Sequence, residues 1–304
     1  MQAPPPRSTR AAILVPFALV TLIWGSTWLV IRDQLGVVPP SWSVTYRFIV
    51  AGLAMAVVAM VKRERFVLDG RGWVFAAAIG LLQFCLNFNF VYRAEHYITS
   101  GLVAVVFAIL LVPNALFARV LLGQRMGGQL IAGSAVAMAG IALLFVHEAR
   151  TGPAGTAATL AGVGFTGMAI LAASMANVLQ ATPTAKRYPM MATLAVAMLI
   201  GAALDGAIAW WLTGPPVIEM RTGYWAGILY LGLAGSAIAF PLYYRVLRMI
   251  GPAKAAYSSV IVPVIAMLLS TLFEGYGWSP LAAAGGALAG IGLVIALRAR
   301  RPNR

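Results

Sequence analysis

Two amide side chains, Gln83 and Asn87, lie in the middle of a strongly apolar run, four residues apart. That spacing puts both on one face of an α-helix. An amide in apolar surroundings is costly unless it has a hydrogen-bond partner, so such residues normally point toward the interior of a bundle. There they can bind the polar groups of a small ligand, or they can hold two helices together. The sequence leaves both interpretations open.

Two ionisable side chains fall inside apolar runs as well. The guanidinium of Arg47 can steady a carboxylate of a ligand, with pairing to a neighbouring helix as the alternative. Asp205 is the one acid expected inside an apolar run. An acid there is a candidate for proton coupling, because charges inside a membrane are retained mainly for function.

Aromatic and hydroxyl side chains complete the set of candidate ligand contacts. Trp24 falls deep in the first apolar run and is expected to line a cavity, whereas Trp28 is expected near the outer interface. Tyr257 and Ser258 stand shortly before Pro263 in a late apolar run. Together these residues predict a binding site with apolar walls and a few hydrogen-bonding groups.

Two prolines interrupt apolar runs at corresponding places, Pro113 and Pro263. A proline inside a helix removes one backbone hydrogen bond and can bend the helix. We expect both prolines to act as hinges. A static kink is the alternative.

Catalytic chemistry is not indicated. The two histidines, His96 and His147, fall in expected loops, and no GxSxG, HExxH or phosphate-binding GxxxxGK[ST] motif occurs. The single cysteine, Cys85, excludes an intramolecular disulfide, and no Cys/His cluster predicts a metal site. We therefore expect neither an enzyme nor a cofactor.

The elements that must position these residues are apolar throughout. With 61% hydrophobic and only 10% charged residues, the 304-residue chain has too little polar surface for a water-soluble globule. A helix needs about 20 residues to cross a bilayer core of ~30 Å. The sequence thus predicts an all-α integral membrane protein with ten transmembrane helices, at roughly 11–31, 42–62, 73–93, 98–121, 127–146, 157–180, 189–212, 222–245, 253–273 and 279–298.

An internal repeat organises these helices. YRAEHYITSGLVAVVFAILLVP, at 92–113, is echoed by YRVLRMIGPAKAAYSSVIVP at 244–263, and AGIAL near 139 is echoed by AGIGL near 289. Ordered matches at an offset of about 150 residues indicate two repeats of five helices, 11–146 and 157–298. Because five is odd, the second repeat is inverted relative to the first. Inverted repeats around a central cavity are typical of transporters that work by alternating access.

The net charge of +14 follows the expected topology. With both termini in the cytoplasm, only five of the 22 lysines and arginines fall at or near the other side: Arg32, Arg47, Arg93, Arg150 and Arg221. Such asymmetry sets the orientation of membrane proteins, so it explains the basic charge without a nucleic acid. The expected partners are the lipid bilayer and a small molecule, and the oligomeric state stays open.

The order of several short motifs resembles the EamA type of the drug/metabolite transporter superfamily, and most of all its YddG-type amino acid exporters. The motifs are Trp24-Gly25-Ser26-Thr27, Pro39-Pro40, Arg47-Phe48, the prolines of spans four and nine, and Leu122-Gly123-Gln124-Arg125. The similarity extends over essentially the whole chain. It implies a ten-helix fold whose central cavity is built mainly from spans one, three, four, six, eight and nine.

These observations lead to one expected function and two alternatives. We expect a secondary or facilitative transporter that exports neutral and aromatic amino acids across the bacterial inner membrane, with Trp24, Arg47, Gln83, Asn87, Tyr257 and Ser258 at its substrate site. An exporter of drugs or other small metabolites is the first alternative. A membrane scaffold or receptor that transports nothing is the second.

Overall fold

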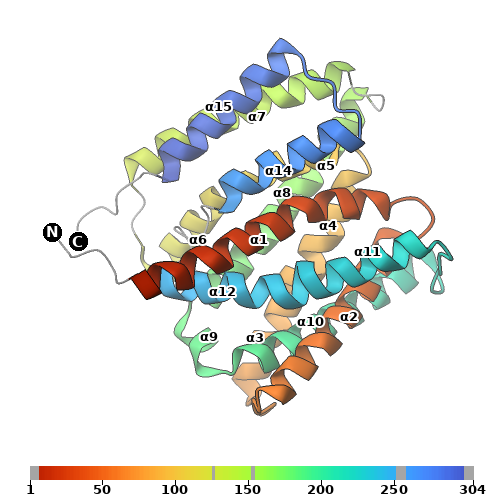
Figure 1. Ribbon diagram of the computed structural model, residues 1–304, viewed down its shortest axis with the longest axis vertical. Helices are drawn as coiled ribbons and strands as arrows, with labels where there is room; N and C mark the ends of the chain where they lie inside the picture. Colours follow the sequence, from red (N-terminus) through yellow and green to blue (C-terminus); the bar gives the residue numbers. More distant parts are fainter. Residues whose placement is uncertain (1–6, 125–126, 152–154, 251–257, 298–304) are drawn as a thin grey trace.

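The computed structural model describes residues 7–124, 127–151, 155–250 and 258–297, and its regular structure in these ranges is helical (Figure 1). The helices of the first half are α1 (Arg7–Asp33), α2 (Pro40–Val61), α3 (Gly70–Ile79), η1 (Gly80–Leu86), α4 (Asn87–Glu95), α5 (Ser100–Phe107), η2 (Ala108–Leu110), α6 (Leu111–Leu122) and α7 (Gly128–Thr151). Those of the second half are α8 (Gly155–Gln180), α9 (Pro183–Arg187), α10 (Met190–Thr213), α11 (Thr222–Gly232), η3 (Leu233–Ile238), α12 (Ala239–Ile250), α14 (Ser258–Phe273) and α15 (Pro280–Leu297).

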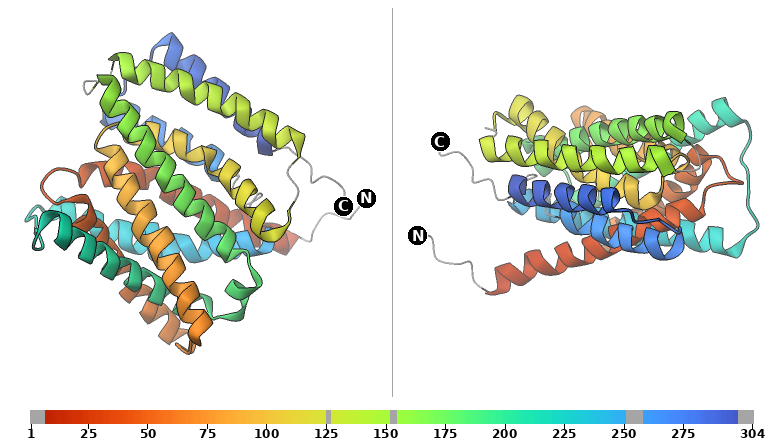
Figure 2. Two further views of the ribbon diagram at one scale, coloured as in Figure 1. Left: turned by 180° about the vertical axis from the view of Figure 1, so that it is seen from behind. Right: turned by 90° about the horizontal axis from the view of Figure 1, so that it is seen from above.

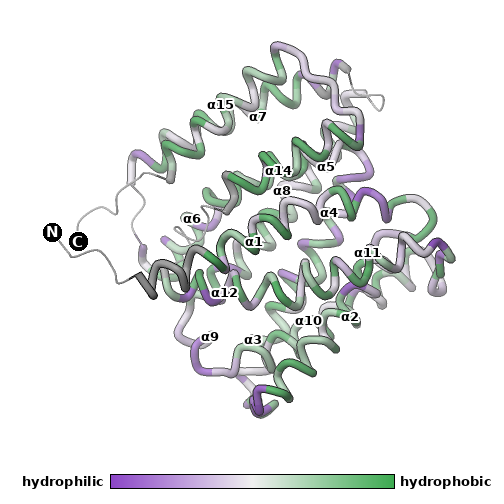
Figure 3. Tube along the Cα trace, viewed as in Figure 1, coloured by the Kyte–Doolittle hydropathy of each residue, from purple (hydrophilic) through white to green (hydrophobic). Residues whose placement is uncertain are grey.

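Eight stretches within the described ranges are long and apolar enough to cross a membrane: 15–33, 40–61, 70–95, 100–122, 128–147, 155–180, 190–213 and 222–249. The apolar parts of α14 and α15, 261–273 and 280–296, are shorter. Hydrophobic residues run along the helices, and hydrophilic ones gather at the loops (Figure 3). The expected all-helical membrane fold is thus confirmed, whereas the number of ten spans remains a prediction.

Proline and glycine mark several helix ends. Pro40 and Pro183 stand in the first turn of α2 and α9, where a missing N–H removes no helical bond. Gly123 ends α6 in the left-handed region, with φ 66°, which glycine adopts without steric cost. Asp69 caps α3 by accepting a hydrogen bond of 2.9 Å from the Gly72 N–H. Short polar turns therefore separate the apolar helices.

Helices of one half pack on helices of the other half in corresponding pairs. Helix α1 packs on α14 and α12, and its counterpart α8 packs on α5, α6 and α4. The counterparts α2 and α10 pack on each other, as do α7 and α15. Figure 1 and the left view of Figure 2 show α7 and α15 side by side at one edge of the bundle. The beginning of α1 and the end of α15 lie at the same end of the bundle in these views.

A π-helical stretch interrupts the third long helix of each half. The stretch η1 joins α3 to α4, and η3 joins α11 to α12. Their first residues, 80 and 233, are 153 positions apart, close to the offset of the sequence repeat. Single π turns are rare and occur frequently at functional sites. The part of the bundle that the two stretches face is therefore a candidate functional region.

Helices α7 and α15 approach each other through glycines, but not on the face of α15 that carries Gly286 and Gly290, although these two have the GxxxG spacing that often marks helix contacts. A Cβ atom built on Gly292 would lie 2.1 Å from the Ala137 nitrogen, and one on Gly140 would lie 2.3 Å from the Ala289 nitrogen. By contrast, a Cβ on Gly290 would meet nothing within 4 Å. The tight face of α15 is thus the one that carries Gly292.

We expect Gly292→Ala to destabilise the protein and Gly290→Ala to leave it as stable or more so. Both changes add the same methyl group and the same helix propensity, about 1 kcal/mol. Only the methyl at position 292 collides with the backbone of α7, and overpacking of this kind costs about 1–3 kcal/mol. Thermal unfolding of the two purified variants in one detergent measures the difference. Equal midpoints would contradict the close approach of α7 and α15.

Polar contacts tie the loop after α2 to the segment before α10. The Glu64 carboxylate accepts a hydrogen bond of 2.9 Å from the Ala192 N–H, in the first turn of α10. The Asp69 carboxylate accepts one from the Tyr188 hydroxyl and lies 3.2 Å from the Arg187 guanidinium. The bond from Tyr188 holds the pKa of Asp69 below its ordinary value. These contacts join the two halves at one end of the bundle.

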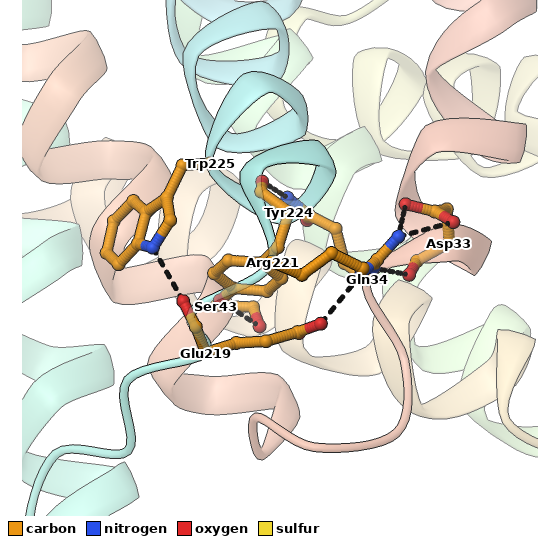
Figure 4. A network of polar contacts seen from close by, with 7 residues as sticks. All are labelled: Asp33, Gln34, Ser43, Glu219, Arg221, Tyr224 and Trp225. Atoms are coloured by element: carbon orange, nitrogen blue, oxygen red, sulfur yellow. Dashed lines mark hydrogen bonds and ion pairs between the residues drawn. The ribbon is translucent and has the colours of Figure 1, made fainter.

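A second polar network joins the halves at the opposite end (Figure 4). The Arg221 guanidinium, just before α11, donates to both carboxylate oxygens of Asp33, at 3.0 and 2.9 Å, and to the Asp33 backbone carbonyl at 2.7 Å. It also donates to Glu219 at 2.7 Å. The hydrogen bonds to Glu219 and Asp33 raise the pKa of Arg221 above its ordinary value. The last turn of α1 is thus held against the start of α11.

Candidate functional site

A cavity of about 100 Å³ lies at the centre of the bundle. It is enclosed by α1, η1, α4, α5, η2, α8, α12 and α14, the helices that the resemblance implied, and by one residue of α2 in addition. Its aromatic, amide and arginine side chains are Trp24, Trp28, Arg47, Gln83, Asn87, Phe88, Phe107, Asn177, Phe240 and Tyr243. The cavity therefore combines aromatic walls with a small number of polar groups, as ligand sites commonly do.

Most of the residues singled out from the sequence meet at this cavity. Trp24, Arg47, Gln83, Asn87 and Pro263 line it. Pro113 and Asp205 are not among its lining residues. Tyr257 lies outside the described residues, and so does the side chain of Ser258, whose backbone begins α14. Their expected roles at the site stay predictions.

Trp24 is held in a defined orientation. Its indole N–H donates to the Gly235 carbonyl of η3 at 3.1 Å. Its ring lies 4.9 Å from the Tyr243 ring and 5.4 Å from the Phe240 ring, between centroids. Trp28, which we expected near the outer interface, is only 8% exposed and lines the same cavity. The aromatic wall of the cavity is therefore larger than the sequence indicated.

Gln83 and Asn87, the two amides that the first half contributes to the cavity, can still form further hydrogen bonds. The Gln83 side-chain oxygen accepts a weak bond of 3.4 Å from the Tyr244 hydroxyl. The Asn87 amide nitrogen donates to the Gln83 backbone carbonyl at 3.4 Å, and the Asn87 side-chain oxygen has no partner among the described residues. An unpaired buried amide oxygen is costly, so a donor supplied by a ligand would offset that cost.

Arg47 is the most unusual residue at the site, because it is 1% exposed and has no carboxylate within ion-pair distance among the described residues. Its Nε donates to the Ser236 hydroxyl oxygen at 3.1 Å, and its Nη1 has no hydrogen-bond partner. The guanidinium carbon lies 4.1 Å from the centre of the Phe88 ring. Aromatic faces and the hydroxyls of Ser236 and Tyr92 only partly replace the water that a buried cation loses.

Several residues at the site were missed in the sequence, among them Asn177 and Tyr243. Asn177, on α8, is 4% exposed and lines the cavity from the second half. It is an amide in an apolar run, the same kind of signal that singled out Asn87. Tyr243 was missed because an aromatic residue in a membrane helix has no distinguishing spacing.

Asp205 belongs to a separate buried cluster. The Asn89 amide donates to the Asp205 carboxylate, and the Asn89 oxygen accepts a hydrogen bond of 2.5 Å from the Ser41 hydroxyl. This cluster joins α10, α4 and α2 away from the cavity lining. The expectation that Asp205 is the one intramembrane acid was wrong, because Glu95 ends the third span and is 0% exposed.

The two prolines occupy comparable but unequal positions. Pro263 lies inside α14 and lines the cavity. Pro113 lies in the first turn of α6, directly after the 3₁₀ turn η2. The carbonyl of Leu110 in that turn accepts a 3.5 Å contact from the Ser174 hydroxyl of α8. Each proline thus stands where regular α-helical bonding is interrupted beside the central cavity.

Together, the fold and the cavity define a polytopic helical membrane protein with a central site for a small molecule. The chain belongs to the EamA-like transporter family, whose model matches residues 11–146 and 154–298. The expectation that it is not an enzyme agrees with membership of a transporter family.

Several curated proteins are similar over most of their length. Protein PagO of Salmonella typhimurium is 24% identical, over 89% of this chain and 88% of its own. The uncharacterized inner membrane transporter YedA of Escherichia coli K12 is 30% identical, over 85% of this chain and 81% of its own. A probable terminal-alkyne amino-acid exporter of Streptantibioticus cattleyicolor is 28% identical, over 91% of this chain and 90% of its own.

A solved crystal structure has the same fold. Its TM-score is 0.69 at 22% identity, and the match covers 96% of this chain and 97% of the other. At that identity the likeness concerns the fold alone.

Proposed function

We propose that this protein exports neutral amino acids, aromatic ones included, across the bacterial inner membrane by alternating access, as YddG-type exporters do. The observation that carries the proposal is the buried guanidinium of Arg47, which faces an aromatic cavity with one nitrogen unpaired. A buried cation with no carboxylate within ion-pair distance is unfavourable, and a substrate carboxylate would supply a close opposite charge and a hydrogen bond.

The rest of an amino acid finds matching groups in the same cavity. The free Asn87 oxygen and the weakly bound Gln83 oxygen can accept hydrogen bonds from the substrate ammonium group. The rings of Trp24, Phe240 and Tyr243 can cover an apolar or aromatic side chain. Since both charged ends of a zwitterion lose water in the cavity, each needs such a partner.

The relatives support this proposal in two respects. The similar protein of Streptantibioticus cattleyicolor is named a probable exporter of an amino acid, and YedA is named an inner membrane transporter. The alternative of a drug or metabolite exporter rests on the same family and the same aromatic walls. The unpaired Arg47 favours the amino acid, because a lipophilic cation would be repelled by it.

The orientation and the repeat boundaries form part of the proposal. Both termini are cytoplasmic, and 11–146 and 157–298 are two inverted five-helix repeats in a ten-span protein. Labelling of single-cysteine variants in intact cells tests this arrangement, with Cys85 replaced. Positions next to Arg65 should react only from the inside and positions next to Arg150 only from the outside. Reaction next to Arg65 from the outside would reverse the orientation.

The transport activity itself is tested with purified protein in liposomes. We expect saturable uptake of labelled phenylalanine without nucleotide, and a marked loss of uptake in Asn87→Ala. Asn114→Ala is the matched control, because Asn114 is an equally buried amide that does not line the cavity. An imposed pH gradient tests coupling through Asp205, since Asp205→Asn should abolish any acceleration by the gradient.

Competing solutes separate the alternatives in the same assay. Transport of a lipophilic cation but of no amino acid would replace the proposal by the drug-exporter alternative. No transport of any solute by correctly folded protein would favour the scaffold alternative.

A further inference from the structure

One short segment of the second half contacts two cavity residues of the first half. The segment is the π-helical stretch η3, Leu233–Ile238. Its Gly235 carbonyl accepts the Trp24 indole N–H at 3.1 Å, and its Ser236 hydroxyl oxygen accepts the Arg47 Nε–H at 3.1 Å. Trp24 and Arg47, two of the side chains that the proposed function assigns to the substrate, are therefore both oriented by η3.

Ser236 is itself fixed in position. It is 0% exposed, and its hydroxyl donates to the Leu231 carbonyl at 2.8 Å, five residues earlier in the chain. With its proton used in that bond, the oxygen presents lone pairs to the Arg47 guanidinium. An arginine side chain has many rotamers, and each additional fixed contact reduces the entropy that is lost when a ligand binds.

The geometry leaves one particular edge of the guanidinium free. Ser236 takes Nε, and the Phe88 ring covers one face at 4.1 Å. Among the remaining polar neighbours, the Tyr92 hydroxyl acts on Arg47 through a side-chain hydrogen bond and electrostatically, and the Glu95 carboxylate acts electrostatically. Nη1 is buried and has no hydrogen-bond partner among the described residues. The contact with Ser236 thus determines which donor of Arg47 is available.

Gly235 provides the space for this arrangement. A Cβ atom at that position would lie 3.0 Å from the Thr27 methyl carbon and 3.5 Å from Arg47 Nη2. The neighbouring Gly232 allows an equally close approach, since a Cβ there would lie 3.1 Å from the Arg47 backbone carbonyl. The absence of side chains at these two glycines lets η3 reach α2 and α1 together.

The first half repeats the arrangement in part. Gln83 lies in η1, 153 positions before Ser236, and its side chain lines the cavity. Each π-helical stretch therefore carries a polar side chain near the cavity. Gln83 of η1 lines the cavity, and Ser236 of η3 binds Arg47, which lines it. This equivalence makes an accidental contact between Ser236 and Arg47 a poor explanation.

We infer that Ser236 is a positioning residue that sets the selectivity of the cavity for solutes with a carboxylate, by holding Arg47 with Nη1 free to bind it. The inference rests on the proposed function, because it concerns the same site and the same substrate class. It adds that selectivity depends on a residue that does not line the cavity.

The test compares phenylalanine with phenylalaninamide, which lacks the carboxylate, as competitors of labelled phenylalanine uptake in liposomes. For the wild type we expect phenylalanine to compete at least tenfold better. Ser236→Ala should raise the inhibition constant of phenylalanine about tenfold and leave that of phenylalaninamide unchanged, the loss expected for one hydrogen bond to a charged group. Ser236→Thr, which keeps the hydroxyl, should retain most of the preference.

Ser134→Ala is the matched control. Ser134 is also buried in a helix and donates to a backbone carbonyl, that of Leu130 at 2.7 Å, but on α7 away from the cavity. It should change neither constant. If Ser236→Ala does not fold, Ser236→Cys replaces it, because cysteine has a similar volume and a weaker hydrogen-bond acceptor. The measured quantity is again the ratio of the inhibition constants of phenylalaninamide and phenylalanine.

The outcomes distinguish the inference from the function on which it rests. An unchanged ratio in folded Ser236→Ala or Ser236→Cys overturns the inference alone, while amino acid transport stands. A wild type that transports phenylalanine without preferring it to the amide overturns both the inference and the role of Arg47. A wild type that transports no amino acid overturns the proposed function, and the inference with it.

Discussion

Replacing Arg47 with glutamine should lower kcat/KM for phenylalanine transport about 10- to 100-fold without lowering the stability of the protein. The loss corresponds to one hydrogen bond between charged groups, at about 1.5–3 kcal/mol. Glutamine keeps a polar side chain, but it is shorter and carries no charge. Uptake kinetics in liposomes and thermal unfolding in detergent give the two quantities on one preparation.

The stability measurement decides between the two interpretations of Arg47. If the residue only pairs helices, its removal breaks the Ser236 contact and the stacking on Phe88, and the protein should become less stable. If Arg47 instead binds the substrate, its replacement by glutamine removes a buried guanidinium charge that is not fully paired, and the stability of the protein should stay equal or rise. Arg47→Lys should have an intermediate effect on transport, since it keeps the charge but loses the planar fork of donors.

A large fall in stability with little change in transport per folded molecule would contradict the ligand role. The loss in Arg47→Gln should also be specific to the carboxylate, so inhibition by phenylalaninamide should change little. Equal losses for phenylalanine and its amide would point to a general distortion of the cavity.

The sequence predicted the helices and four cavity residues because both depend on rules that act locally. Apolar length predicts a span, and a polar group within a span predicts an inward face. Trp24, Arg47, Gln83 and Asn87 all satisfy the second rule and all line the cavity. Asn177 satisfies it equally, so its omission was not a limit of the sequence.

Other features depend on how helices turn about their own axes, and this is set only by packing. Gly286 and Gly290 have the spacing of a helix contact, yet Gly292 is the residue against α7. Gly290 and Gly292 are only two residues apart but lie on different faces of α15. Small residues occur on every face of that helix, so the sequence does not indicate which face packs on α7. The π-helical stretches were not predicted either, because no local sequence rule distinguishes one extra residue in a turn.

The third span shows how an uncertain boundary affects the list of charged residues. Its expected end at residue 93 left Glu95 outside, whereas the helix continues to Glu95 and buries it fully. Two residues of error at one helix end thus removed a buried acid from consideration. The contact between Ser236 and Arg47 could not be predicted for a different reason. The two residues are 189 positions apart in the chain, and local sequence rules do not tell which distant residues meet.

Pro263→Ala should slow transport about fivefold at saturating substrate while leaving the apparent affinity nearly unchanged. Pro263 lies inside α14, and the proline removes the N–H that would bond the Ser259 carbonyl. Alanine restores that donor and favours a straighter helix, so bending during the exchange between the two open states costs more. A barrier raised by ~1 kcal/mol gives this change in rate.

Pro280→Ala is the matched control for the hinge, because Pro280 occupies the first position of α15, where a missing N–H costs no helical bond. It should leave the rate unchanged. Pro113→Ala should slow transport less than Pro263→Ala, since Pro113 stands in the first turn of α6 and does not line the cavity. Saturation kinetics of the three variants in liposomes measure these differences. Wild-type rates in both Pro113→Ala and Pro263→Ala would mean that the prolines produce static kinks, and the motion of the halves would then have to be sought at other interruptions, such as η1 and η3.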